Sequence, residues 1–300
     1  MYARFFFKSL WLALIHRFDA IHAFRALPEG LVAWAVARLT FRPVVIYAHG
    51  EELTTWGKGG KYKAMRFALR HADTIIANSD FTRQELLLMG VREERIVLIN
   101  PGVDVERFRP GLPCDDLKQH INLGLGEKLI LSVGRLSRRK GFDMVVRSLP
   151  ELIRQGIAVR YALIGIGEDH DYLIKLAREL GVADRVHLLG HVATKDLARW
   201  YNACDVFVMP NREINGDTEG FGMVFLEAAA CGKPAIAGAA GGTGSAIIDG
   251  ITGFRVDGSK EVETAAVLSR LLLHPNIGDM LGTAARQRSL AEFSWEQVAR

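Results

Sequence analysis

The chain has 300 residues, 49% of them hydrophobic and 24% charged, which is typical of a soluble globular protein with one large or two medium domains. Thirty glycines against nine prolines exclude a low-complexity chain. The net charge of +4 is uneven, because residues 1–70 contain eleven Lys and Arg against four Asp and Glu. This basic part favours an anionic partner, such as lipid headgroups, a nucleotide or nucleic acid, and a solvated basic face is a serious alternative.

The cysteines and histidines show no pattern of a metal site or a disulfide framework. Cys114, Cys204 and Cys231 lack CxxC spacing, which indicates a reducing compartment without structural disulfides. The nine histidines lack HExxH or another metal-ligand spacing. We therefore expect no metal site.

The first segment, MYARFFFKSLWLALIHRF, predicts an amphipathic helix that leads into a strand. Its apolar run is too short to span a bilayer and is interrupted by Lys8. A signal peptide is an alternative, since Arg4 precedes an apolar stretch. The aromatic residues Phe5–Phe7 and Trp11, with Arg4, Lys8 and Arg17, could lie on a membrane surface. A helix packed on a sheet fits the composition equally well.

Further along the chain, short apolar runs alternate with stretches of helical periodicity. We expect strands at Ala20–Ala23, Val44–Tyr47, Thr74–Ala77, Ile96–Ile99, Leu129–Val133, Tyr161–Ile164, Val186–Leu189, Val206–Met209 and Ala235–Ala237. We expect helices at Leu31–Leu39, Asp80–Met89, Phe142–Gln155, Tyr172–Leu180 and Val224–Ala230. Ser79 can cap the second of these helices, and Gly90 can end it. Strands that alternate with helices predict parallel sheets covered by helices.

A domain boundary is expected near residues 100–126, where three prolines interrupt the periodicity. We predict an α/β fold with two Rossmann-like domains that face each other across a cleft. Residues 1–110 would form the N-terminal domain, 111–127 the linker and 128–300 the C-terminal domain. Ligands of open α/β sheets bind beyond the carboxyl ends of the strands, so the residues that follow each strand are the candidates for a site.

Two glycine-containing turns follow predicted strands of the C-terminal domain. In the first, Gly165 and Gly167 begin a dinucleotide fingerprint, but His170 replaces its third small residue, which makes an NAD-dependent function a weak prediction. In the second, VGRLSRRKGF, Arg135 and Lys140 follow a strand and precede a helix. Two cations in this place suit a diphosphate, although a plain basic turn is common.

In the N-terminal domain, His49 and Gly50 follow the strand Val44–Tyr47. A lone histidine is more often structural than catalytic, but its place at the carboxyl edge of a sheet favours a role in the site.

The stretch NREINGDTEGFGMVFLEAAACGKP contains two carboxylates around the start of a helix. Gly220 and Gly222 let backbone amides approach a phosphate or sugar closely. Glu219 and Glu227 would accept hydrogen bonds from hydroxyl groups, one from the transferred sugar and the other from the ribose. A hydrolase with an acid/base pair of carboxylates is the alternative that this spacing leaves open.

These motifs resemble family 4 retaining glycosyltransferases of the GT-B fold, and the particular forms HGEE and GDTEGFGMVFLEAAACGKP are similar to bacterial phosphatidylinositol mannosyltransferase-like enzymes. The match includes EGFGMVFLE, GRLSRRKG, the HG after its strand, ANSDFTR at 77–83 and NPGVDVERFRP at 100–110, in the order of the family.

The resemblance implies a role for each matching residue. Arg135 and Lys140 bind the nucleotide diphosphate, and Glu227 contacts the ribose. His49 and Glu219 lie near the reacting sugar and are the catalytic candidates. The donor is also expected to contact the backbone amides of Gly220, Phe221, Gly222 and Met223, and, near the base, Val192. The family implies retention of the anomeric configuration by front-face attack, with no cofactor and no required metal.

Two departures from the family pattern stand out. The chain begins about two βα units late, roughly 60 residues by the usual size of such units, so we expect a first domain truncated at its N-terminus. The sequence Gly241-Gly242-Thr243-Gly244-Ser245 replaces the usual Gly-Gly-x-Pro-Glu near the phosphates.

The predicted function is transfer of a hexose, mannose or glucose, from GDP-mannose or UDP-glucose to a hydroxyl of a lipid-linked or glycan acceptor. We expect a hexosyltransferase of cell-envelope glycan biosynthesis that is cytoplasmic, either free or peripheral on the inner membrane face, without a nucleic acid partner. The alternative is an inactive module that binds a nucleotide sugar and needs an N-terminal segment or a partner chain. A GT-B epimerase remains open, and nothing points to the pyridoxal phosphate lysine of a phosphorylase.

Overall fold

The computed structural model describes residues 2–16, 18–55 and 59–300. By its internal contacts the chain divides into unit 1, made of Met1–Asn100 and Asn215–Phe221, and unit 2, made of Pro101–Ile214 and Gly222–Arg300. Each unit contains a parallel sheet with helices, so the predicted α/β fold class with two parallel-sheet domains is confirmed. The stretch 111–127, which the sequence predicts to be a linker, lies in unit 2 and includes helix α6 (Asp115–His120).

Unit 1 contains a four-stranded parallel sheet in the order β1-β2-β3-β4. Its strands are β1 (Ile21–Ala23), β2 (Val44–Ala48), β3 (Thr74–Ala77) and β4 (Ile96–Leu98). Its helices are α1 (Tyr2–Ile15), η1 (Ala26–Gly30), α2 (Leu31–Thr40), α3 (Glu51–Thr55), α4 (Gly60–His71), α5 (Asp80–Leu88) and η2 (Glu93–Arg95).

Buried residues alternate along β2 and β3, so this sheet buries one face more completely than the other. The buried face packs on Met65 and Leu69 of α4 and on Leu86 of α5. The predicted cap of α5 is confirmed, because the hydroxyl oxygen of Ser79 accepts a hydrogen bond from the amide of Thr82 at 3.1 Å.

Unit 2 contains a six-stranded parallel sheet in the order β10-β9-β8-β5-β6-β7. Its strands are β5 (Lys128–Val133), β6 (Val159–Ile164), β7 (Val186–Gly190), β8 (Val206–Met209), β9 (Ala235–Gly238) and β10 (Phe254–Val256). After α6, its helices are η3 (Arg138–Lys140), α7 (Phe142–Arg154), α8 (His170–Glu179), η4 (Ala183–Arg185), α9 (Thr194–Ala203), α10 (Met223–Ala230), α11 (Thr243–Ala246), α12 (Glu261–Leu273), α13 (Pro275–Glu292) and α14 (Trp295–Val298).

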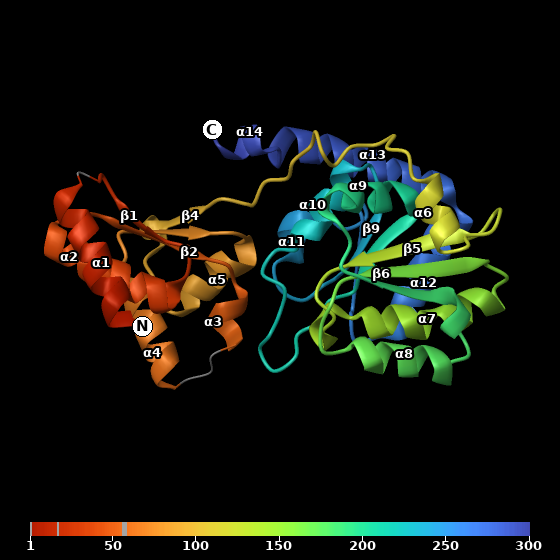
Figure 1. Cartoon of the computed structure of the whole chain (residues 1–300), viewed down its shortest axis with the longest axis horizontal. Helices are drawn as coiled ribbons and strands as arrows, with labels where there is room; N and C mark the ends of the chain where they lie inside the picture. Colours follow the sequence, from red (N-terminus) through yellow and green to blue (C-terminus); the bar gives the residue numbers. More distant parts are fainter. Residues whose placement is uncertain (1, 17, 56–58) are drawn as a thin grey trace. The chain divides into compact units, whose positions relative to one another are not determined.

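The strands of unit 2 run between two layers of helices. In Figure 1, α7, α8 and α12 lie on one side of the sheet, and α9, α10 and α13 lie on the other. Because both faces are covered, every residue of β8 and β9 is buried. The chain adds β6 and β7 on one side of β5 and then β8, β9 and β10 on the other, so the order of the strands reverses between β5 and β8. Such a switch point is where ligands of open α/β sheets bind.

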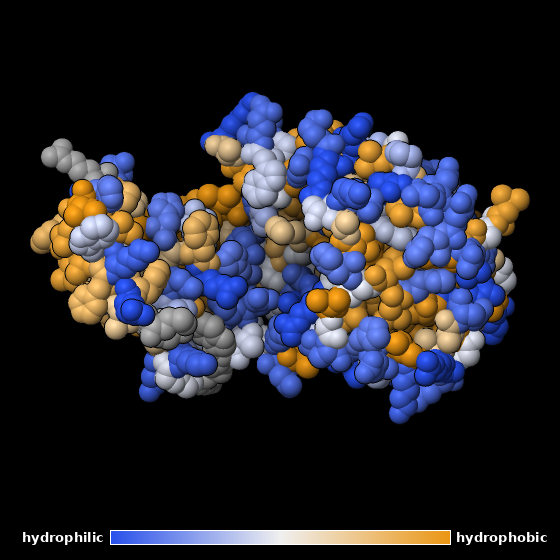
Figure 2. Space-filling view, viewed as in Figure 1, coloured by the Kyte–Doolittle hydropathy of each residue, from blue (hydrophilic) through white to orange (hydrophobic). Residues whose placement is uncertain are grey.

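Helix α1 exposes much of its apolar surface. Phe7, Trp11 and Leu14 are more than half exposed, and Figure 2 shows hydrophobic residues gathered over α1 and α2. Arg4 and Lys8 are exposed on the same helix, whereas Arg17, which the sequence analysis groups with them, lies outside the described residues. Within the described part of the chain, no helix is long and apolar enough to cross a membrane.

Candidate functional site

The loop that follows β5 is packed closely against its neighbours at the switch point of unit 2. A Cβ atom added to Gly165, which follows β6, would lie 1.8 Å from the carbonyl oxygen of Gly134. A Cβ atom on Gly141 would lie 2.0 Å from the carbonyl oxygen of Pro210, which follows β8. Gly141 also has a φ of +73°, a conformation that glycine adopts without strain. The glycines therefore let three strand ends meet at one place.

Arg135 and Lys140 both lie in this loop. The guanidinium of Arg135 is exposed and pairs with Glu168, with Nη2 3.1 Å from Oε1. An exposed pair of this kind contributes little to stability, so Arg135 can exchange Glu168 for a stronger anionic partner at low cost. The Cε atom of Lys140 lies 3.9 Å from where a Cβ atom of Gly134 would be, which brings this side chain back over the end of β5.

A buried ion pair fixes the loops on both sides of the switch point. Nη2 of Arg212, in the loop after β8, lies 3.0 Å and 2.9 Å from the two carboxylate oxygens of Asp143 in the first turn of α7. The backbone amide of Arg212 also donates to the carbonyl of Arg139 at 2.8 Å. These contacts hold the loop after β8 beside the loop after β5 before any ligand arrives.

Helix α10 begins at the same switch point. Gly222 has a φ of +91° and turns the chain into the helix, whose first residue, Met223, is half exposed. The first amides of a helix lack intrahelical partners and form a site for oxygen atoms of an anion. In α10 the amide of Phe225 already donates to the carbonyl of Gly222 at 3.0 Å, so the amides before it are the candidates.

Glu227 lies one turn into α10 and is mostly buried. The hydroxyl of Tyr201, on α9, donates a hydrogen bond to its Oε2 at 2.7 Å. Burial raises the pKa of the Glu227 carboxyl, and the Tyr201 hydrogen bond and the charge of Arg107 oppose that rise. A mostly buried carboxylate with one oxygen already bonded to Tyr201 is suited to accept further hydrogen bonds from hydroxyl groups through the other oxygen.

His49 follows β2 in unit 1 and is held at three points. Its amide donates to Glu52 Oε1 at 2.8 Å, and its carbonyl accepts from Asn78 Nδ2 at 3.0 Å. Its Nε2 lies 2.8 Å from the carbonyl oxygen of Phe24 and must be the donor there. In the neutral ring this leaves Nδ1 as the acceptor.

The segment Asn215–Phe221 brings Glu219 to this part of unit 1. The hydroxyl of Ser79, which is fully buried, donates to the carbonyl of Gly220 at 2.7 Å. A Cβ atom on Gly220 would lie 1.8 Å from the carbonyl oxygen of His49, so only glycine allows this approach. Gly220 therefore packs directly against the backbone of His49, and Glu219 is the residue that precedes it in the chain.

The structure thus places the predicted site residues in two groups. Arg135, Lys140, Gly222, Met223 and Glu227 lie at the β5/β8 switch point of unit 2. The residue Val192 follows β7 in the same unit, two strands away from β5. The other predicted residues, His49, Glu219, Gly220 and Phe221, belong to unit 1. The roles that the resemblance implies for both groups stay predictions.

Sequence reasoning missed three residues that support these groups. Tyr201, Asp143 and Arg212 contact the predicted residues or their loops, but the partners of these three residues lie 26 or 69 positions away in the sequence, and no local pattern pairs them. One available signal was the charge of Asp143 on the mainly apolar buried face of α7. Across the described residues, no group of three or more His, Cys, Asp or Glu side chains is arranged to hold a metal ion.

Family models match both parts of the chain. Residues 115–288 match the model described as "Glycosyl transferases group 1", and residues 1–107 match "Glycosyltransferase Family 4".

Similar proteins and structures agree with these family models. The chain is 31% identical over 283 residues to a GDP-mannose-dependent alpha-(1-6)-phosphatidylinositol monomannoside mannosyltransferase of Mycolicibacterium smegmatis, which covers 93% of this chain and 74% of that protein. It is 33% identical to a D-inositol 3-phosphate glycosyltransferase of Frankia alni, over 94% of this chain and 72% of that protein.

Among solved structures, a sucrose-phosphate synthase from Thermosynechococcus elongatus superposes with a TM-score of 0.83 and 25% identity, over 99% of this chain and 75% of that one. HepE of Anabaena, crystallised with UDP, gives a TM-score of 0.87 at 23% identity, over 98% of this chain and 79% of that one. With both family models matched and the fold shared with these structures, the chain belongs to the group 1 and family 4 glycosyltransferases of the GT-B fold.

Proposed function

We propose that this glycosyltransferase moves a hexose from a nucleotide diphosphate sugar to a hydroxyl group with retention of the anomeric configuration. The observation that carries the proposal is the set of groups at the switch point of unit 2. Two cations, the start of α10 and a mostly buried carboxylate are brought together where the loops after β5 and β8 meet.

The donor's nucleotide diphosphate would use these groups in three ways. The guanidinium of Arg135 leaves Glu168 and binds phosphate oxygens, and Lys140 neutralises the charge that grows on the leaving diphosphate. The first amides of α10 donate hydrogen bonds to further oxygen atoms of the donor substrate. Glu227 accepts hydrogen bonds from ribose hydroxyls with the oxygen that Tyr201 does not occupy.

The residues of unit 1 would serve the transferred sugar. Glu219 is proposed to accept hydrogen bonds from its hydroxyls, and His49 to present Nδ1, because Nε2 already donates to Phe24. In front-face transfer the bond from the anomeric carbon to the phosphate oxygen breaks as the bond to the acceptor oxygen forms on the same face. The acceptor's proton passes to the leaving phosphate oxygen, so no enzyme nucleophile and no metal ion are required.

Donor and acceptor are proposed from the relatives and from α1. GDP-mannose, which the relative from Mycolicibacterium smegmatis uses by its name, is the first candidate donor, and UDP-glucose the second. A lipid-linked acceptor of cell-envelope glycan synthesis agrees with the exposed apolar surface of α1, which carries Arg4 and Lys8. Such a helix can lie on the inner face of a membrane that contains anionic lipids. A glycan hydroxyl is the alternative acceptor.

The test is a transfer assay with GDP-mannose and UDP-glucose, in the presence and absence of EDTA, with the product examined by NMR. We expect transfer of one hexose with the anomeric configuration of the donor and an unchanged rate in EDTA. Inversion of configuration would contradict the retaining mechanism. Nucleotide-sugar binding without transfer to any hydroxyl would support instead the alternative of a binding module that needs another chain or segment.

A further inference from the structure

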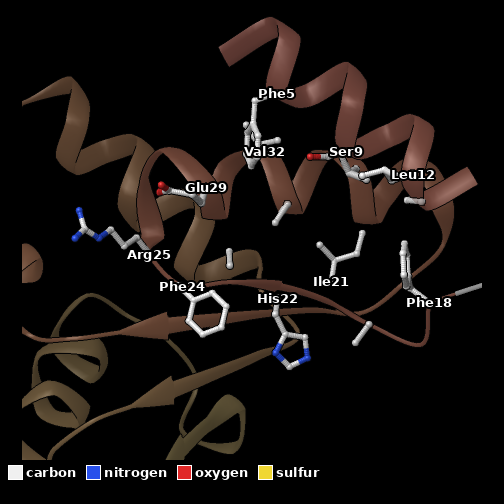
Figure 3. A pocket seen from close by; sticks show the side chains of 15 residues that line it. Phe5, Ser9, Leu12, Phe18, Ile21, His22, Phe24, Arg25, Glu29 and Val32 are labelled. Atoms are coloured by element: carbon white, nitrogen blue, oxygen red, sulfur yellow. The ribbon is translucent and has the colours of Figure 1, made fainter. Parts of the chain in front are cut away.

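Unit 1 contains a cavity of about 600 Å³ that the proposed chemistry does not use (Figure 3). It lies among α1, β1 and α2 and is lined mainly by apolar side chains, among them Phe5, Leu12, Phe18, Ile21 and Val32. Its volume falls within the range of pockets that bind small organic ligands. In Figure 3, Phe18 and Leu12 lie at one end of the cavity, and Glu29 and Arg25 lie at the other.

The carboxylate of Glu29 gives this cavity a polar end. Its Oε2 atom is buried and, among the described residues, has no hydrogen-bond partner. An unsatisfied buried carboxylate oxygen loses its hydration without compensation, so a ligand that donates a hydrogen bond there recovers that loss. A carboxylate oxygen only accepts hydrogen bonds, so Glu29 Oε2 selects a hydroxyl or another donor over a ligand whose own head group is a carboxylate.

The polar end of the cavity is also the end nearest to His49 along the sheet. Phe24 and Arg25 line the cavity and follow β1, and the carbonyl of Phe24 accepts the hydrogen bond from His49 Nε2 at 2.8 Å. Strands β1 and β2 pair in parallel, with Ala23 opposite Ile46, so the residues that follow both strands lie at one edge of the sheet. A ligand whose chain fills the cavity therefore has its polar head at the edge where His49 lies.

We propose that this cavity binds the apolar chain of a neutral amphiphile whose head group carries hydroxyls, one of which donates to Glu29. The inference rests on the proposed function in one respect, since it names such an amphiphile as the acceptor. Binding of the chain itself is independent of transfer, which allows the two to be tested apart.

The experiment is isothermal titration of the full chain with n-alkanols from hexanol to decanol, below their solubility limits, and with decanoate as the charged comparison. Each methylene that enters the cavity should strengthen binding about fourfold, until the cavity is full. We expect decanol to bind at least about tenfold more tightly than decanoate, because decanoate has no hydrogen to donate to Glu29 Oε2.

Three variants distinguish binding inside the cavity from binding on the exposed surface of α1. Ala33→Phe fills the cavity and should weaken decanol binding at least about tenfold, and Ser9→Leu should weaken it in the same direction. Glu29→Gln keeps the size of the side chain and removes its charge, so the preference for decanol over decanoate should shrink. Phe7→Ala is the matched control, since Phe7 is exposed on α1 and does not line the cavity.

Affinity that does not depend on chain length, or that falls in Phe7→Ala and not in the two cavity variants, would overturn the proposal. So would self-association of the chain that Ala33→Phe abolishes while no alkanol binds, because it would assign the cavity to a second copy. Nucleotide titration of the same variants reports whether unit 2 is intact. A chain that binds nucleotide and no alkanol refutes this inference alone, whereas one that binds alkanol and no nucleotide refutes the proposed function alone.

Discussion

Replacing Glu227 by glutamine tests the donor site at a single atom. Oε2 of Glu227 is already bonded to Tyr201, so Oε1 is the oxygen left for a ribose hydroxyl. The glutamine keeps the size of the side chain and one neutral carbonyl acceptor, but it loses the charge. A hydrogen bond to a charged group contributes about 1.5–3 kcal/mol, which corresponds to a weakening of nucleotide binding of about 10- to 160-fold in Kd.

The same substitution should not destabilise the fold. Burial raises the pKa of the Glu227 carboxyl in the folded state above its ordinary value. A raised folded-state pKa contributes stability that is present below the unfolded pKa and is lost as the pH rises through the folded pKa. At neutral pH the ionised side chain therefore lowers stability, and Glu227→Gln should leave Tm unchanged or raise it.

The assay is titration of the preferred nucleoside diphosphate into wild type and Glu227→Gln, with thermal unfolding of both. Glu179→Gln is the matched control, since Glu179 lies on the exposed surface of α8 in the same unit. Unchanged nucleotide affinity in Glu227→Gln, or an equal loss in Glu179→Gln, would refute the ribose contact. A large fall in Tm would show that the variant acts through the fold.

Three further predictions concern single side-chain contacts and one close backbone approach. Tyr201→Phe removes the hydrogen bond that lowers the pKa of Glu227, so this carboxylate should be protonated at a higher pH than in wild type. As the pH is lowered, nucleotide affinity should therefore begin to fall at a higher pH in the variant, as measured by titration at several pH values. Gly220→Ala places a methyl group 1.8 Å from a backbone carbonyl and should destabilise unit 1 by about 1–3 kcal/mol in denaturant unfolding, while Gly60→Ala, which meets open space, should not. Arg212→Met leaves a buried carboxylate unpaired and should cost about 3–5 kcal/mol in the same measurement, and adding Asp143→Leu should recover most of it; equal stability of the single and double variants would contradict this.

Much of the fold could be predicted from local pattern. All nine predicted strands are present within about two residues of their predicted ends, because each is a short run of β-branched or apolar residues bounded by turns. Strand β10 was missed, since Phe254–Val256 has three residues with an arginine at its centre, and only its pairing with β9 makes it a strand. The helix predicted at the N-terminus is confirmed as α1 (Tyr2–Ile15).

From the sequence, the site could be predicted only for residues that come after a predicted strand. His49, Arg135 and Lys140 each follow a strand, and parallel strands carry such residues to one edge of their sheet. The sequence does not reveal that Asn215–Phe221 packs in unit 1, because that depends on Gly220 meeting the backbone of His49 and on the buried hydroxyl of Ser79. Contacts between residues far apart in the sequence decide such a placement, and no local motif encodes them.

The most direct test of the donor site is titration of the intact chain with GDP, UDP and ADP, repeated with Arg135→Ala/Lys140→Ala. Arg178→Ala/Lys175→Ala, on the exposed side of α8, keeps the same change in net charge as a control. We predict clear binding of one nucleoside diphosphate, lost in the first double variant and kept in the second. Binding that both double variants retain equally, or no binding of any nucleotide to wild type, would contradict the assignment of the β5/β8 switch point as the nucleotide-sugar site.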